Sequence, residues 1–478
     1  MIEGQSIKSI STEIKSQRLK SEDVVKFYLD KINKYNEDLN AIISLRDESE
    51  VLSEAREKDQ LIKNKSQTGL LHGLPLAVKD TVDVTELPTS YGCIEYKNNF
   101  PTEDSIITER LKKEGAIIIG KTNTAELAYG SQTTNRLFGS TYNPYNTSKT
   151  AGGSSGGAAA AVSSGMLPLA DGSDMMGSVR NPAAYCNLYG FRPTPGLIPE
   201  KRVEPLNSEC PLLSTLGGIA KTPDDLSLFL DSVAGRDSRD SFSFDLNAKF
   251  LETSMSEDDF KKIKIGWLGN LNNNYSFENG IIELCEKSLN ILMSNPFNIS
   301  IEEVKTNLFS QDIWDIWTTI RSKISYDDIK MMKDINLDDL CFAAKWEYDQ
   351  GIKISDEEFV QKIDGINRYR SVFNQLFEKY DFLAMPSAQV FPFDANISFP
   401  KKIGSHSLST YHKWMETTII ASLFQLPTLS VPVGFNNSGL PMGMQIIGKK
   451  AYDLKVMSFG KKYESIFNHS NVKPDGFN

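Results

Sequence analysis

The sequence predicts an α/β fold, in which helices alternate with the strands of a β-sheet. Short apolar runs such as Leu74–Val78 and Ala116–Ile119 alternate with helical stretches such as Ser105–Gly115. Of the 478 residues, 40% are hydrophobic and 24% are charged, so the chain can bury a large core without disulfides. Neither an internal repeat nor a clear linker interrupts the sequence, which favours a single domain over residues 1–478.

The N-terminal segment, residues 6–65, is predicted to be helical. Apolar residues recur there at helical spacing, namely Val24, Val25, Tyr28, Leu29 and Ile32. Ser21 precedes them and is a suitable N-terminal cap. These helices are expected either to cover the sheet or to form a homodimer contact, and the sequence does not decide between the two.

The core of the predicted domain comprises residues 70–230. Within it, residues 139–196 are rich in Gly, Ser and Ala and poor in charge. The glycine-rich run Gly152–Gly157 leads into Ala158–Val162, a helix of small residues that can lie very close to a neighbouring element.

The C-terminal half is predicted to be helical first and then rich in strands. Residues 235–375 are more charged and mostly helical in pattern, with one strand at Ile263–Leu268. Strands return in the closing region, residues 376–460, at Phe382–Met385, Thr428–Val433 and Met442–Ile447. The turn-rich connection Gly434–Pro441 joins the last two strands.

The net charge of −10 disfavours general binding to nucleic acid, because it repels phosphate backbones. The five cysteines include no C-x-x-C pair, which is typical of a cytosolic protein. The first residues lack a basic stretch followed by an apolar one, and no apolar run approaches the ~18 residues of a membrane-spanning helix. We therefore expect a cytoplasmic protein that does not cross a membrane.

Two short segments match known catalytic sequence patterns, but the secondary structure predicted around them is not the one that these patterns require. Gly115–Thr122 fits the phosphate-loop pattern, but its middle residues, Ala and three Ile, predict a strand instead of a loop. Gly152–Gly156 fits the nucleophile elbow, but the preceding Asn143–Thr147 indicates a loop where a strand is needed. Of the four histidines, His412 lies in a helical stretch, Tyr411–Ser422. An NTPase and a Ser-His-acid enzyme are therefore disfavoured, and no residue cluster has metal-ligand spacing.

Two glycine-rich segments that carry serines remain, Gly153–Gly157 and Asp174–Ser178, together with Lys79 after a buried strand. A lysine can activate a serine for acyl transfer if burial lowers its pKa from about 10.4. Consecutive backbone N–H groups across Met175–Ser178 can stabilise an oxyanion. From the residues alone, plain turns and a surface lysine are an equally good interpretation.

Six segments in the same order along the chain resemble the amidase signature family. They are Gly73–Asp80, Gly120–Asn123 with Glu126, Gly152–Gly157, Gly172–Ala183, Leu426–Pro432 and Gly439–Gly443. The resemblance spans about half of the chain and is most specific at Gly172–Ala183. It implies an α/β/α sandwich around a large twisted mixed β-sheet. It also implies an amidohydrolase that cleaves carboxamides through a serine acyl-enzyme, without a metal or another cofactor.

The resemblance assigns Ser178 as the nucleophile, Lys79 as the base, and Ser154, preceded by a cis peptide bond, as the bridge between them. The oxyanion hole that it implies consists of backbone N–H groups of Met175, Met176, Gly177 and Ser178. Residues expected to support the site are Ser155 and Ser173, through hydrogen bonds, and Asp174 and Arg180, through a charge pair that locks the loop. Lys121 and Glu126 are expected to be a plain fold-stabilising pair.

The substrate is left open by the sequence. The family usually has two glycines before the nucleophile, and Met176 occupies the first of these places, which puts the shape of the acyl pocket in question. C-terminal residues that can line a pocket are Gln389, His406, His412 and Trp414.

Two alternatives to a stand-alone bacterial-type amidase remain. The first is the glutaminase (A-type) subunit of a glutamyl-tRNA(Gln) amidotransferase, which needs partner subunits and charges for the α-amino and α-carboxyl groups of glutamine. The sequence does not identify such charges, and Met176 argues for the stand-alone enzyme. The second is a catalytically inactive binding protein with the same fold.

Overall fold

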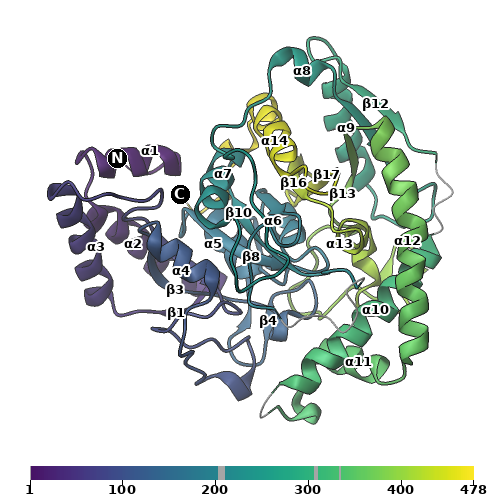
Figure 1. The fold of residues 1–478 in the computed structure, drawn as a ribbon, viewed down its shortest axis with the longest axis horizontal. Helices are drawn as coiled ribbons and strands as arrows, with labels where there is room; N and C mark the ends of the chain where they lie inside the picture. Colours follow the sequence, from purple (N-terminus) through teal and green to yellow (C-terminus); the bar gives the residue numbers. More distant parts are fainter. Residues whose placement is uncertain (1, 203–209, 306–309, 333–334, 478) are drawn as a thin grey trace.

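The computed structural model describes residues 2–202, 210–305, 310–332 and 335–477. A mixed eight-stranded sheet forms its centre, in the strand order β12-β11-β13-β17-β16-β9-β10-β8 (Figure 1). In chain order these strands are β8 (Leu169–Asp174), β9 (Tyr189–Arg192), β10 (Thr215–Ala220), β11 (Lys264–Trp267), β12 (Ser300–Glu303), β13 (Phe382–Pro386), β16 (Thr428–Phe435) and β17 (Pro441–Gly448). The predicted α/β class and the predicted closing strands are therefore confirmed, and β16 and β17, joined by the turn-rich connection, form an antiparallel pair.

A second, three-stranded sheet lies beside the first, in the order β1-β3-β2. It contains β1 (Ile42–Leu45), β2 (Pro75–Lys79) and β3 (Ile117–Thr122). Strand β3 is the segment that fits the phosphate-loop pattern, so its interpretation as a strand is confirmed. The edge of β2 faces β8, because the backbone N–H of Lys79 donates to Asp171 Oδ1 over 3.0 Å. Short two-stranded ribbons also occur, comprising β4 (Thr134–Asn135) with β5 (Gly139–Ser140), β6 (Tyr142–Asn143) with β7 (Asn146–Thr150), and β14 (Lys402–Ile403) with β15 (His406–Ser407).

Helices cover both faces of the central sheet. Adjacent glycines of β10 show this, since a Cβ on Gly217 would approach Val179 at the start of α6 (Arg180–Tyr185), whereas one on Gly218 would approach Phe229 of α7 (Pro223–Val233). Helix α14 (Asp453–Phe467) also packs on β16 and β17. The predicted three-layer α/β/α sandwich is thus confirmed.

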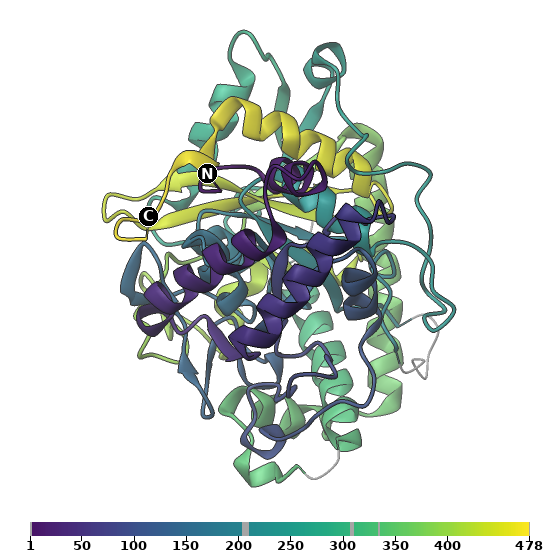
Figure 2. The ribbon, with the colours of Figure 1, turned by 90° about the vertical axis from the view of Figure 1, so that its left-hand side faces the viewer.

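The N-terminal helices are α1 (Ile7–Lys15), α2 (Ser21–Leu39) and α3 (Glu48–Lys63). Helices α2 and α3 pack against the three-stranded sheet, and Figure 2 shows the N-terminal helices across this side of the molecule. The strand β1 within this segment was not predicted. A homodimer contact remains a prediction.

Ser21 does not cap α2, contrary to expectation. It is the first helical residue, and its hydroxyl has no hydrogen-bond partner among the described residues. The free backbone N–H groups of Ser21 and Glu22 donate instead to the carboxylate of Asp59 in α3, over 2.7 and 3.3 Å. A side chain from another helix therefore takes the place of a local cap.

The predicted helix of small residues is α5 (Gly156–Ser163), and all of its residues are buried. A Cβ on Gly157 would lie 2.3 Å from the backbone nitrogen of Asn123, so only glycine permits this approach. The predicted helix over Ser105–Gly115 is α4 (Ile106–Lys113).

Residues 235–375 are mostly helical, as predicted. The helices are α8 (Glu257–Lys261), α9 (Ile281–Met293), α10 (Ser310–Met331), α11 (Phe342–Gly351) and α12 (Asp356–Lys379). The predicted strand is β11, whereas the edge strand β12 was missed because its mostly exposed residues lack an apolar pattern. Helices α10 to α12 lie together at one end of the molecule (Figure 1).

The remaining helix, α13 (Ile419–Leu423), follows a 3₁₀ turn at Lys413–Thr418. Across the described ranges, no helix combines the length and apolar character needed to cross a membrane. The single domain over residues 1–478 remains a prediction.

Candidate active site

Lys79 stands at the end of β2 and is completely buried. Its Nζ donates hydrogen bonds to Ser154 Oγ over 2.8 Å and to Ser173 Oγ over 2.9 Å. The expectation that a lysine at this place is an ordinary surface charge is therefore wrong. The structure brings it together with two of the serines that the sequence predicts for the site.

Burial lowers the pKa of Lys79 to about 7, although Asp171 and Asp174 oppose the shift. Burial also raises the pKa of Asp171 to about 6. The ammonium form is disfavoured because it must give up its hydration inside the protein. A sizeable fraction of Lys79 is consequently neutral near pH 7 and able to accept a proton.

Ser154 lies in a tightly packed loop between β7 and α5. The peptide bond between Gly153 and Ser154 is cis, as the resemblance implies. A Cβ on Gly153 would lie 2.8 Å from the backbone of Gln132, and the Ser154 carbonyl accepts a hydrogen bond from Thr133 Oγ1 over 3.1 Å. These contacts hold the Ser154 hydroxyl toward Lys79.

Ser178 is carried by the tight turn that joins β8 to α6. Asp174, at the end of β8, accepts hydrogen bonds from the backbone N–H groups of Gly177 (2.8 Å) and Val179 (3.1 Å). The Arg180 guanidinium binds the same carboxylate, with Nη2 2.8 Å from Oδ1. The expected charge pair is therefore present, and it fixes the turn from within.

The electrostatics of this turn favour an ionised Asp174. Burial opposes ionisation, but the positive charges of Arg180 and Arg192 keep the pKa of the carboxyl well below its usual range. Arg180 is fully buried and also donates to the Thr418 carbonyl over 2.9 Å. The turn is thus tied to the C-terminal part of the chain.

One member of the expected oxyanion hole is already occupied. Because the Gly177 N–H donates to Asp174, it is not free to bind an oxyanion, which corrects the expectation for this residue. The φ of Gly177 is +83°, a left-handed conformation that turns the chain here. The N–H groups of Met175, Met176 and Ser178 remain as the expected donors.

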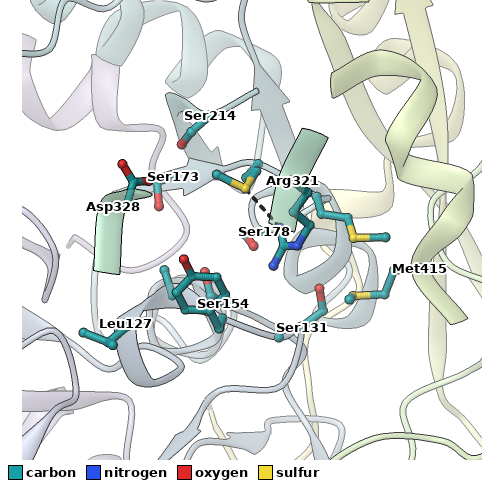
Figure 3. A pocket seen from close by; sticks show the side chains of 14 residues that line it. Leu127, Ser131, Ser154, Ser173, Ser178, Ser214, Arg321, Asp328 and Met415 are labelled. Carbon is teal, nitrogen blue, oxygen red and sulfur yellow. Dashed lines mark hydrogen bonds between the residues drawn. The ribbon is translucent and has the colours of Figure 1, made fainter. Parts of the chain in front are cut away.

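A cavity of about 230 Å³ opens over these residues (Figure 3). Ser154, Ser173 and Ser178 line its base, and Ser178 is 7% exposed. Among the described residues, no hydrogen bond joins Ser154 to Ser178, but both side chains face this one cavity. A substrate carbonyl can therefore reach Ser178 beside the turn that carries the expected donors.

Two charged residues that the sequence did not single out also line the cavity. Arg321 and Asp328 both come from α10, in the segment of residues 235–375. They are seven positions apart, which places them on one face of the helix about two turns from each other. That spacing was visible in the sequence, but it did not reveal which way the helix faces.

Arg321 is held from behind by a buried network. Its Nε donates to Glu347 Oε1 over 2.6 Å and its Nη2 to the Tyr411 hydroxyl over 3.2 Å. Its Nη1 points to Met175 Sδ at 3.0 Å, the dashed contact in Figure 3. A thioether is a weak acceptor, so this edge of the guanidinium can still donate to a ligand oxygen.

Two of the expected contacts do not form. The Ser155 hydroxyl has no hydrogen-bond partner among the described residues, because it packs against Gly172 of β8. Lys121 does not pair with Glu126. Its Nζ donates to Thr89 Oγ1 over 2.9 Å, whereas Glu126 pairs with Arg136 over 3.1 Å.

The four residues proposed for the pocket wall lie elsewhere. His406 is exposed on the β14–β15 ribbon, and His412 is buried among aromatic rings, where burial lowers its pKa to about 3. Trp414 packs against Phe393, and Gln389 donates to Glu416 over 3.2 Å. Their neighbour Met415 reaches the cavity instead.

Within the described ranges, no group of three or more His, Cys, Asp or Glu residues is arranged to hold a metal ion. The absence of a cofactor stays a prediction. The groups that the cavity offers for chemistry are the serine hydroxyls, the lysine that serves them and backbone N–H groups.

Comparison with known proteins shows which family the chain resembles. A family model described as Amidase matches residues 23–457. The A-type glutamyl-tRNA(Gln) amidotransferase subunit of Saccharolobus solfataricus is 30% identical, over 96% of this chain and 96% of that protein. An acylamidase of Rhodococcus erythropolis is 28% identical, over 98% and 97% of the two chains. The crystal structure of a bacterial aryl acylamidase of the amidase signature enzymes superposes with a TM-score of 0.89 at 26% identity, covering 99% of this chain and 98% of that one.

Proposed function

This chain belongs to the amidase family and is an amidohydrolase, and we propose that it is a stand-alone amidase. It hydrolyses a linear carboxamide to the carboxylic acid and ammonia or an amine, through an acyl-enzyme on Ser178. The observation that carries this proposal is the hydrogen bond between Lys79 Nζ and Ser154 Oγ, beneath the cavity that Ser178 also lines.

In the first half-reaction, neutral Lys79 takes a proton from Ser154 as Ser154 takes one from Ser178. The Ser178 oxygen attacks the amide carbonyl, and the oxyanion forms against the free N–H groups of the Met175–Ser178 turn. The proton returns along the relay to the amide nitrogen, and the C–N bond breaks. An acyl ester on Ser178 remains, and ammonia or an amine leaves.

In the second half-reaction, water attacks the ester and loses its proton to the same relay. The C–O bond to Ser178 breaks, the proton returns to Ser178, and the carboxylic acid leaves. A serine bridge serves both directions because its hydroxyl donates and accepts at once. A neutral lysine can accept from Ser154 while it still donates to Ser173, which fits the two contacts of Nζ.

The second candidate is the A-type subunit of a glutamyl-tRNA(Gln) amidotransferase, the name of the relative with 30% identity. The cavity does contain charges of both signs, Arg321 and Asp328, which the zwitterion of glutamine needs. However, Glu347 already pairs with Arg321 at 2.6 Å, so the described residues that line the cavity offer no unpaired cation for the α-carboxylate. This favours the stand-alone amidase.

Ammonia release from a panel of amides tests the proposal. The panel spans short aliphatic, aromatic and amino-acid carboxamides and includes free glutamine, with Ser178→Ala as the control. Release from simple amides that the mutation abolishes supports the stand-alone amidase. Release from glutamine alone, together with co-purification of further subunits, supports the amidotransferase.

An inactive binding protein is the remaining alternative, and it is disfavoured by the family's activity. An acyl-directed serine probe separates the two possibilities directly. Labelling of the wild-type protein, and none of the Ser178→Ala protein, supports a reactive nucleophile at this position.

A further inference from the structure

We propose that Asp328 determines substrate specificity by binding a protonated amino group, so that the preferred substrates are amides that carry an amine and no carboxylate. This inference rests on the proposed amidase function and names the substrate class of that site. Asp328 touches the cavity from α10 and is drawn near Ser173 in Figure 3.

Asp328 is a carboxylate without a cation. It forms no ion pair and no side-chain hydrogen bond with any residue in the described ranges, although it lines the cavity. Asp328 is exposed, and the like charge of its neighbour Asp327 acts on it. A carboxylate in this position gains most from a ligand that brings a positive charge.

Arg321 does not supply that charge. Its guanidinium is bound to Glu347, and both side chains are almost completely buried, with exposures of 4% and 0%. The rise of ~1.5 Å per helical residue also places Arg321 about two turns away from Asp328. The pair of Arg321 and Glu347 is neutral as a whole, so Asp328 leaves this wall with one net negative charge.

The part of the cavity wall that Arg321 forms suits an uncharged oxygen of the ligand. Among the described residues, Nη1 has only the Met175 sulfur as acceptor, and a carbonyl oxygen of the substrate is a stronger one. A carboxylate there would share this wall with the net negative charge of Asp328, which disfavours an anionic group. The polar groups therefore select against anionic amides.

Apolar side chains make up much of the remaining wall, namely Leu127, Met175, Met176 and Met415. They suit a short methylene chain between the reacting amide and the amine. The cavity volume is about 230 Å³, which limits the length of this chain.

The test compares matched carboxamides that differ only in the terminal group. We compare 5-aminopentanamide, pentanamide and the monoamide of glutaric acid by ammonia release. The pair N-(4-aminobutyl)pentanamide and N-butylpentanamide places the amine on the leaving group instead, and acid release is measured. In at least one of the two series, kcat/KM for the amine should exceed that of its neutral partner by about tenfold, with the anion slowest.

The variant Asp328→Asn should bring the ratio of amine to neutral amide close to one. Asp327→Asn is the matched control, since it removes an adjacent charge that does not line the cavity, and it should keep the ratio. Thermal unfolding verifies that both variants are folded. Measurable but equal rates for amine and neutral amide in both wild-type series, or a preference that survives Asp328→Asn, would overturn the inference.

Calorimetric binding to the Ser178→Ala protein separates this inference from the proposed function. Tighter binding of 5-aminopentanamide or N-(4-aminobutyl)pentanamide than of its neutral partner supports Asp328 as the cation site even if the wild-type protein hydrolyses neither. In that case only the proposed hydrolysis of such amides fails. Hydrolysis that depends on Ser178 but shows no charge preference sustains the amidase and refutes the role of Asp328.

Discussion

Lys79 Nζ lies 2.8 Å from Ser154 Oγ, and both side chains are completely buried. The hydrogen bond places the lysine where a general base for a serine relay is needed. Burial, and not a neighbouring cation, is the main reason that the pKa of Lys79 falls to about 7. A base with a pKa near the working pH combines a large neutral fraction with useful basicity.

The rate should follow the titration of Lys79. Below a pH of about 7 the lysine is protonated and cannot accept a proton, and above it the neutral form dominates. We therefore expect kcat/KM for a neutral amide to rise with pH through a midpoint near 7 and then to level off. A profile measured from pH 5 to 9 that falls over this range would contradict the assignment.

The activity that remains after removal of the proposed base, Lys79, should depend on pH in a specific way. Lys79→Ala should lose at least about 10³-fold in kcat/KM at pH 7, because Ser154 then has no proton acceptor. Any recovery should be confined to alkaline pH, where hydroxide can remove the proton. Normal activity of this variant at neutral pH would show that another group is the base.

The three residues that we propose for catalysis could be predicted from the sequence, but the charged residues of α10 that line the cavity could not. Ser154 and Ser178 lie in glycine-rich segments and Lys79 ends a buried strand, and the order of these segments carries the family pattern. The structure brings Lys79 and the two serines to one place. Their positions depend on local turns and on the end of a strand, which short motifs specify.

Arg321 and Asp328 are different, because their role depends on how α10 packs. The sequence of a charged amphipathic helix does not indicate which of its faces lines a cavity. The ion pair between Arg321 and Glu347 also depends on tertiary packing, because it joins residues of two helices. The same reason explains the missed cap of α2, where Asp59 acts across a tertiary contact. The predicted hydrogen bond of Ser155 was wrong for a different reason. The segment matches the family motif, but packing turns the Ser155 hydroxyl toward Gly172.

Asp174 is expected to matter for stability as well as for geometry. Asp174→Asn removes the charge that compensates Arg180 and Arg192, both of which are fully buried. Such a loss should destabilise the fold by about 3–5 kcal/mol. The control Asp237→Asn breaks a more exposed pair with Arg239 and should change stability by no more than about 1 kcal/mol. Urea unfolding at pH 7 measures both.

The sign of the pH effect follows from the lowered pKa of Asp174. Its stabilising contribution is present above the pKa of an unfolded aspartate, about 3.9, and is lost as the pH falls through the folded value. The difference in unfolding free energy between the wild type and Asp174→Asn should therefore shrink in acid. A difference that stays constant down to pH 2 would show that the charge is not the cause.

Met176 should limit the size of the acyl group. It is 3% exposed, lines the cavity together with Ser178, and stands where the resemblance of the sequence leads us to expect a glycine. Met176→Ala removes most of its side chain and leaves the backbone N–H in place for the oxyanion. We expect kcat/KM to rise for branched and aromatic amides relative to acetamide, by about tenfold, at a cost of about 2–4 kcal/mol in stability.

Met415→Ala, on another part of the wall, is the control for a general widening of the cavity. If both variants shift the preference equally, the cavity volume and not Met176 sets the acyl specificity, whereas a shift confined to Met176→Ala identifies this side chain as the boundary of the acyl site.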